Sequence, residues 1–180
     1  MKDVFLLLVF YSFLGYLLER MFAKLSLAPQ QVRKCFLLLP LCPVYGLAMV
    51  LHLSLLPPEG LPFWPLVLRG ALVTTGVEYL VHLFYDKILH VRFWDYTGLW
   101  GQLRGRVCLP FSIAWGLLSA LAVHAVQPEL ARLAAALPAW LAYVLLLLLA
   151  ADAVLSWQLL RRYGDTELLS WRAVAARLAE

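Results

Sequence analysis

The sequence predicts an all-α integral membrane protein, and three features support this fold class: its composition, its long apolar runs and the charge of its connections. Of the 180 residues, 63% are apolar and 14% are charged, and the mean hydropathy is +0.80. A soluble domain has about 45–50% apolar and about 25% charged residues. The composition therefore disfavours a water-soluble enzyme and a disordered chain. Three cysteines without a CxxC pair disfavour a disulfide or zinc-ribbon scaffold.

Five segments hold the roughly 20 apolar residues that a membrane-spanning helix needs. We place these spans at residues 4–22, 35–56, 62–89, 108–126 and 137–160. They define a predicted five-helix transmembrane domain over residues 1–160. A cytoplasmic interfacial tail follows at 161–180, where mixed apolar and charged residues predict a short amphipathic helix. The first span is expected to stay in the protein, because Glu19 and Arg20 stand where a signal cleavage site needs small residues.

Positive charge alternates between the connections. The connection after the second span holds Glu59 alone, and the one after the fourth holds Glu129 and Arg132. Lysine and arginine gather in the other two connections and the tail: Lys24, Arg33, Lys34, Lys87, Arg92, Arg104, Arg106, Arg161 and Arg162. The positive-inside rule then places the N-terminus outside and the C-terminus in the cytoplasm. These loops also account for the net charge of +4, so no nucleic-acid partner is predicted.

The third span is unusually polar. Glu78, His82 and Asp86 are spaced by four residues, so they share one side of a helix. A charged group near the bilayer centre costs about 2.5–3.5 kcal/mol on insertion scales, and such groups usually face the bundle interior or a water-filled cavity. Glu78 is the deepest of the three. The structural alternative is an ion pair of Glu78 with Arg106 or Arg69.

Residues 90–107 do not resemble an ordinary linker, because they combine four aromatic residues with three glycines. Phe93, Trp94, Tyr96 and Trp100 favour apolar cover while Tyr and Trp offer polar hydrogens. This pattern predicts a packed re-entrant or interfacial segment at the mouth of the bundle. An interfacial aromatic belt is the alternative.

Several short motifs appear in a fixed order along the first four spans. They are Tyr11–Tyr16 with Glu19, Cys42-Pro43-Val44-Tyr45-Gly46, Glu78-Tyr79, Trp94-Asp95-Tyr96 and Gly105-Arg106-Val107-Cys108. Over residues 5–126 the chain thereby resembles the ABC-transporter type IV (CmpB-like) family of small bacterial membrane proteins. It is distantly similar to vertebrate transmembrane protein 229. The resemblance implies a bacterial cytoplasmic (inner) membrane location and a transport role.

The pattern and the resemblance together give a candidate polar site in the membrane interior. Its predicted members are Glu19, Tyr45, Glu78, His82, Trp94, Asp95, Tyr96 and Arg106. The leading hypothesis is a transport or channel-type protein in which Glu78 binds an ion, proton or small polar solute. His82 and Arg106 would tune the acid, and Trp94-Asp95-Tyr96 would plug the cytoplasmic mouth. Because five spans make a small bundle, we expect a homodimer or a partner membrane subunit.

Two other hypotheses stay open. In a membrane-embedded enzyme acting on lipid, Glu78, His82 and Asp95 would exchange protons, or Glu78 and His82 would share a metal ion with Asp86, Asp95 or Glu19. In a structural or accessory subunit, the polar groups would only hold the helices together. The chain has no G-x-x-x-x-G-K-[ST], HExxH or GxSxG motif, so neither an ATPase nor a hydrolase mechanism is predicted. No cofactor or resident metal is predicted.

Overall fold

The computed structural model describes residues 1–25, 35–57 and 60–169, and the regular elements in this part of the chain are helices, without a strand. The main helices are α1 (Lys2–Leu25), α2 (Pro43–Ser54), α3 (Phe63–Phe84), α4 (Leu109–Leu121), α5 (Gln127–Ala136) and α6 (Ala139–Tyr163). Two π-helical turns, η2 (Tyr85–Leu89) and η3 (Ala122–Val126), extend α3 and join α4 to α5. A 3-10 turn, η4 (Thr166–Leu168), follows α6.

Four helical stretches of the described residues are long and apolar enough to cross a membrane. They are Lys2–Leu25, Phe63–Leu89, Leu109–Ala136 and Ala139–Tyr163. The prediction of a multi-pass helical membrane protein is therefore confirmed. The count of five spans is not, because α2 has only 12 residues and is about 18 Å long, against a hydrocarbon core of about 30 Å.

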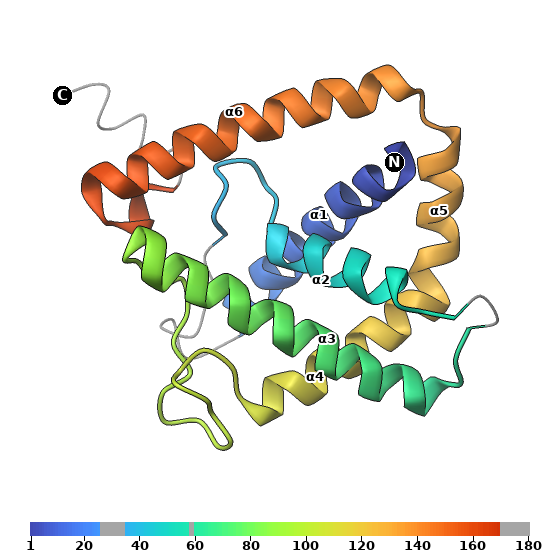
Figure 1. The fold of residues 1–180 in the computed structure, drawn as a ribbon, viewed down its shortest axis with the longest axis horizontal. Helices are drawn as coiled ribbons and strands as arrows, with labels where there is room; N and C mark the ends of the chain where they lie inside the picture. The colour runs from blue at the N-terminus through green and yellow to red at the C-terminus, as the bar shows by residue number, and fades with distance from the viewer. Residues whose placement is uncertain (26–34, 58–59, 170–180) are drawn as a thin grey trace.

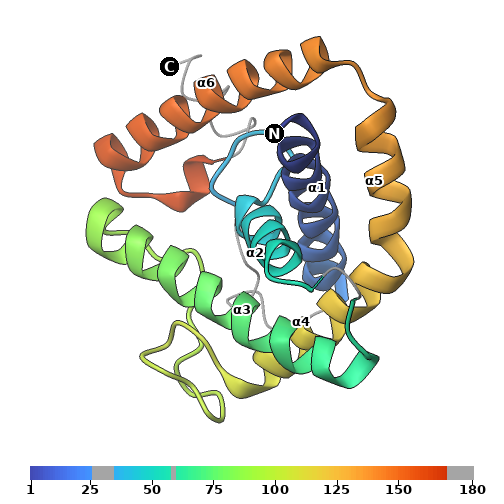
Figure 2. The same ribbon diagram turned by 45° about the vertical axis from the view of Figure 1, so that its right-hand side comes forward.

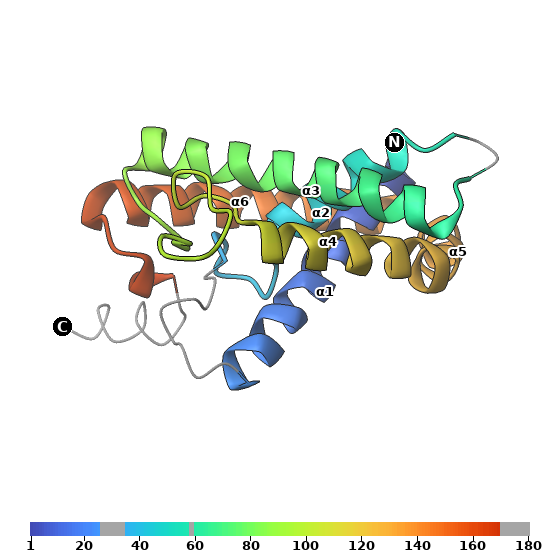
Figure 3. The ribbon, with the colours of Figure 1, turned by 90° about the horizontal axis from the view of Figure 1, so that it is seen from below.

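The helices surround the short helix α2 (Figure 1). α2 packs against α1 and α3, and α3 packs along α4. Both Figure 1 and Figure 2 show α5 and α6 turning around the outside of this group, with α6 running back across the bundle. Figure 3 shows α1 leaving the layer of α3, α4 and α6 at an angle.

The fourth predicted span is longer than expected. We expected a connection from residue 127 to 136, but the chain stays helical through η3 and α5 to Ala136. Pro128 lies in the first turn of α5, directly after the π-helical turn η3. Of the predicted amphipathic tail, residues 170–180 lie outside the described residues.

The second predicted span is half irregular and half helical. Residues 35–42 form no helix, and α2 begins only at Pro43. The ring of Phe36 stacks on Tyr85 of η2, 5.6 Å between centroids, so this irregular part starts near one end of the third span. The other end of α2 leads to Pro62, which precedes α3.

Every backbone N–H of residues 38–43 has an acceptor, as a chain inside a bilayer requires. The Asp152 carboxylate of α6 accepts the N–H of Leu38 at 3.1 Å and that of Leu39 at 2.9 Å. Leu41 donates to the carbonyl of Leu39, and Cys42 donates to the carbonyl of Ser12. Residues 40 and 43 are prolines and have no N–H. Asp152 is 6% exposed. Its carboxylate therefore stabilises the non-helical part of the second predicted span.

Glycines let the central helices approach closely. A Cβ at Gly46 of α2 would collide with the Leu8 carbonyl and the Ser12 hydroxyl of α1. A Cβ at Gly15 of α1 would collide with the ring of Tyr45. By contrast, a Cβ at the exposed Gly76 of α3 would meet nothing within 4 Å. Small residues at helix contacts are the usual means of packing in membranes.

Replacing Asp152 by leucine should destabilise the protein, because two buried N–H groups lose their acceptor at a cost of about 1–3 kcal/mol each. Asp152→Asn keeps one carbonyl oxygen and should cost less. The measurement is the thermal unfolding midpoint in detergent, with hydrogen exchange at Leu38 and Leu39. Glu129→Gln, at an exposed carboxylate of α5, is the control. Equal stability of the leucine and asparagine variants would contradict the assigned role.

Gly46→Ala and Gly76→Ala form a matched pair with opposite expected results. The added methyl group at Gly46 forces α1 and α2 apart and should lower the unfolding midpoint. At Gly76 alanine should be neutral or stabilising, since glycine costs a helix interior up to about 1 kcal/mol relative to alanine. Thermal unfolding of both purified variants checks this. A Gly46→Ala protein as stable as Gly76→Ala would show that the contact can relax.

Candidate functional site

Glu78 lies on the inner face of α3 and is 2% exposed. Its Oε1 accepts a hydrogen bond from the hydroxyl of Tyr96, at 3.0 Å. The Tyr96 ring in turn stacks on Phe111 of α4, with 4.9 Å between centroids. The predicted aromatic segment thus reaches into the bundle and contacts the deepest acid of the third span.

Residues 90–107 fold into a packed cap at the end of the third span. His90 ends η2 in the left-handed conformation, with φ 56°. A bridge between Leu103 and Val107 then closes the segment on itself. Its inner side chains join Tyr85, Leu89, Cys108 and Leu160 in one buried cluster: Val91, Phe93, Trp94 and Tyr96. Trp100 at the tip is 74% exposed, so only part of the aromatic content is buried.

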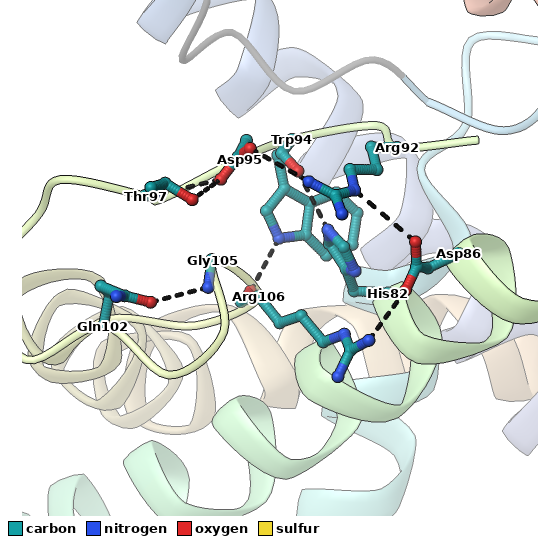
Figure 4. A network of polar contacts seen from close by, with 9 residues as sticks. All are labelled: His82, Asp86, Arg92, Trp94, Asp95, Thr97, Gln102, Gly105 and Arg106. Carbon is teal, nitrogen blue, oxygen red and sulfur yellow. Dashed lines mark hydrogen bonds and ion pairs between the residues drawn. The ribbon is translucent and has the colours of Figure 1, made fainter. Parts of the chain in front are cut away.

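Trp94 and His82 connect the cap to α3 (Figure 4). His82 Nε2 lies 3.0 Å from the carbonyl oxygen of Trp94. Because a carbonyl only accepts, Nε2 carries a hydrogen and donates it to this oxygen. The indole Nε1 of Trp94 donates to the carbonyl of Arg106 at 2.9 Å. The first bond ties the cap to α3, and the second ties the two ends of the cap to each other.

Arg106 pairs with Asp86 and not with Glu78, which corrects the alternative of a Glu78 ion pair with Arg106. Its Nη2 lies 2.8 Å from Asp86 Oδ2, and its Nη1 donates to the hydroxyl of Tyr79 at 3.1 Å. The guanidinium also lies over the Tyr79 ring, 5.3 Å from its centroid. Figure 4 shows the side chain pointing towards η2. Arg106 therefore braces the cap and the end of the third span.

Asp95 lies on the exposed side of the cap, where its side chain contacts Thr97 and Arg92 (Figure 4). Its Oδ1 accepts the N–H of Thr97 at 2.8 Å and the Thr97 hydroxyl at 2.6 Å. Its Oδ2 lies 3.4 Å from Arg92. A Cβ at Gly105, where φ is +69°, would stand 2.6 Å from Asp95 Oδ1. The hydrogen bonds from Thr97 hold the pKa of Asp95 below its usual value.

Glu19 and Tyr45 form a second buried contact, between α1 and α2. The Tyr45 hydroxyl donates to Glu19 Oε1 at 2.5 Å, and Glu19 is 7% exposed. Tyr45 lies in the first turn of α2 because the helix begins at Pro43. Its ring also fills the space above Gly15.

A cavity of about 310 Å³ lies between α1, α2, α3, α4 and η3, and Glu78 and Tyr45 line it. Most of the wall is apolar. The polar side chains in the wall are Tyr11, Tyr45, Thr74, Glu78, Trp115 and Ser119. Of the predicted site residues, only Tyr45 and Glu78 belong to the wall; Glu19 and Tyr96 contact them, and His82, Trp94 and Arg106 form the brace described above.

Sequence reasoning missed Thr74, Trp115 and Ser119 as wall residues. A helical repeat marks two of them, because Trp115, Ser119 and Ala122 are spaced by four and three and so share one face of the fourth span. Among the described residues, no group of three His, Cys, Asp or Glu side chains is arranged to hold a metal ion. The metal hypothesis for Glu78 and His82 therefore lacks a third ligand in the described residues.

The turn around Asp95 should open in acid. A lowered folded-state pKa means that the stabilisation is present above the unfolded pKa of about 3.9 and is lost as the pH falls through the lower folded value. Hydrogen exchange at the Thr97 amide, corrected for its intrinsic rate, should therefore accelerate only below about pH 4. Asp95→Asn keeps the acceptor oxygen but cannot titrate, so it should show no such step. Identical pH profiles for both proteins would refute this assignment.

Comparisons with known proteins bear on the family. The family model described as "Putative ABC-transporter type IV" matches residues 6–157. No curated protein matches the chain, so the similarity to transmembrane protein 229 is not shown. No solved structure matches it either. With most of its length matched by one family model, this multi-pass membrane protein belongs to the ABC-transporter type IV (CmpB) family.

Proposed function

We propose that this protein is a small membrane transport or channel-type protein in which Glu78 binds an ion, a proton or a small polar solute. The observation that carries the proposal is the cavity of about 310 Å³ with the Glu78 carboxylate in its wall. An acid at membrane depth costs about 2.5–3.5 kcal/mol on insertion scales. Tyr96 donates a hydrogen bond to this acid, which fixes one of its oxygens beside the cavity.

The broken second span supports a transport role. Discontinuous helices in transporters place irregular backbone beside the binding site, near the middle of the membrane. Here the break at residues 35–42 is followed directly by Val44 and Tyr45, which line the cavity. The irregular part and α2 together are long enough to cross the bilayer, which supports five crossings over residues 1–160.

The remaining features of the proposal follow from charge and size. The lysines and arginines of alternate connections favour an N-terminus outside and a C-terminus in the cytoplasm, and the family favours a bacterial inner membrane. A bundle this small favours a homodimer or a partner subunit around the path. The second candidate is a structural or accessory membrane subunit, and it is supported by the contacts of Arg106, Asp86 and Trp94, which hold the cap to the helices. The lipid-enzyme hypothesis loses support, since Asp95 lies outside the interior and Arg106 binds Asp86.

Reconstituted vesicles on a solid-supported membrane test the proposal. Wild-type protein should give a current after a jump in pH or in Na⁺ or K⁺ concentration, and Glu78→Gln should reduce that current at least tenfold. The substitution keeps the size and hydrogen bonding of the side chain, so size-exclusion profile and unfolding midpoint should stay close to wild type.

Glu129→Gln supplies the matched control, because it makes the same chemical change at an exposed position of α5. Its currents should equal those of the wild type. Currents that persist in Glu78→Gln, or their absence in wild type after every jump, would contradict the proposal. Loss of folding in Glu78→Gln would make Glu78 a structural brace.

A further inference from the structure

We propose that the tip of the cap, residues 99–104, inserts into the headgroup region of one membrane leaflet and binds anionic phospholipid there through Arg104. The proposal goes beyond the proposed function, because it involves neither Glu78 nor the cavity. Three features of the described residues support it: the position of the tip beside a membrane-spanning helix, its exposed apolar side chains and the unbalanced positive charge of the cap.

The tip lies where a helix enters the bilayer. The cap connects two candidate membrane spans, Phe63–Leu89 and Leu109–Ala136, so it lies at one surface of the membrane domain. Within the tip, a Cβ at Gly101 would stand 2.8 Å from the Cβ of Leu109. Figures 1 and 2 both show the cap at the side of the bundle, between the end of η2 and the start of α4. The tip is therefore level with the first turn of a membrane span, near the lipid headgroups.

Two large apolar side chains of the tip are mostly uncovered by protein. Trp100 is 74% exposed and Leu103 is 55% exposed. On α4, Leu109 and Ile113 are 40% and 51% exposed, and their spacing of four residues places them on one face of the helix. In a bilayer such a face contacts acyl chains, and the tip extends it towards the headgroups. Tryptophan is enriched at this level of membrane proteins, because its ring is apolar and its N–H is polar.

The backbone of the tip holds Arg104 in a conformation that glycine adopts more easily. Its φ is +54°, in the left-handed region that is uncommon for residues with a Cβ. Glycine fills three other positions of the cap that have a positive φ, namely Gly98, Gly101 and Gly105. An arginine at such a position is locally disfavoured, which points to a use for its side chain.

Positive charge exceeds negative charge in the cap and the turn before it. Residues 85–107 contain four lysine or arginine residues and two aspartates. Both aspartates already form ion pairs, with Arg92 and Arg106. Lys87 and Arg104 are exposed, and among the described residues neither forms an ion pair. An exposed guanidinium can donate two parallel hydrogen bonds to a phosphate, so this surface complements a leaflet that contains anionic phospholipid.

Quenching of tryptophan fluorescence by brominated lipid tests the position of the tip. The purified full chain is placed in nanodiscs, and the emission of Trp100 is taken as the difference between a protein and its Trp100→Phe form. Phosphatidylcholine brominated near the headgroup end of its acyl chains should quench this emission at least twofold more than phosphatidylcholine brominated near the chain ends. Unfolding midpoints should stay at the wild-type value, because the Trp100 side chain is exposed.

Brominated phosphatidylglycerol with the same acyl chains tests the charge. Half-maximal quenching of Trp100 should need at least fivefold less of it than of phosphatidylcholine, since one basic residue near an anionic surface strengthens binding about fivefold. Arg104→Gln should reduce this preference about fivefold. Arg132→Gln makes the same chemical change at an exposed arginine of α5 and should leave the preference unchanged. Raising the salt concentration from about 0.1 M to about 1 M should weaken the wild-type preference, because the Debye length falls from about 10 Å to about 3 Å.

The salt series uses the wild type, so the test stays valid if Arg104→Gln fails to fold. The proposal is overturned if no brominated lipid quenches Trp100, which would place the tip in water, or if bromine near the chain ends quenches it more. Equal quenching by the two lipids, or a preference that neither salt nor Arg104→Gln changes, would also overturn it. None of these results bears on the Glu78-dependent currents, and loss of those currents would leave the lipid site standing.

Discussion

The structure depends on the carboxylate of Asp152, which accepts two backbone N–H groups from a non-helical stretch inside the membrane domain. A bilayer core supplies no water to such groups, so irregular backbone survives there only with protein acceptors. With Asp152 in place, the second predicted span can start as a bent chain and become helical only at Pro43. Tyr45 then lies in the first turn of α2, where it reaches Glu19 and the cavity. A continuous helix from residue 35 would place these side chains differently.

Four acids of the membrane domain have different surroundings. Asp152 accepts backbone N–H groups, Glu19 accepts the Tyr45 hydroxyl, and the half-buried Asp86 pairs with Arg106 of the cap. Each of these acids contacts an element that would otherwise be poorly anchored. Glu78 differs because it also forms part of the cavity wall. The hydrogen bond from Tyr96 couples this wall to the cap, so the position of the cap and the environment of the acid depend on each other.

Composition and hydropathy predicted the helical membrane fold and five spans, of which four correspond to long apolar helices, because apolar length is a direct physical requirement of a bilayer. They could not reveal the break in the second span, where the apolar run from 35 to 56 is continuous; Pro40 and Pro43 were its only signal. Helical spacing predicted that Glu78 and His82 share a buried face. It could not predict that Arg106 forms its ion pair with Asp86, or that the Asp95 side chain is exposed, because those contacts depend on how residues 90–107 fold. The wall residue Trp115 comes from a different span and needed the packing of α4 on α3.

Whether Glu78 serves the fold or a ligand can be argued from its surroundings. An acid that serves stability is expected to accept hydrogen bonds from buried donors that would otherwise have no acceptor, as Asp152 does for two backbone N–H groups. One partner of Glu78 is the hydroxyl of Tyr96, and Glu78 also forms part of the cavity wall. Most of that wall is apolar, so an apolar residue at this position would match its neighbours. The position of an acid beside space for a small molecule therefore favours the proposed binding role over a purely structural one.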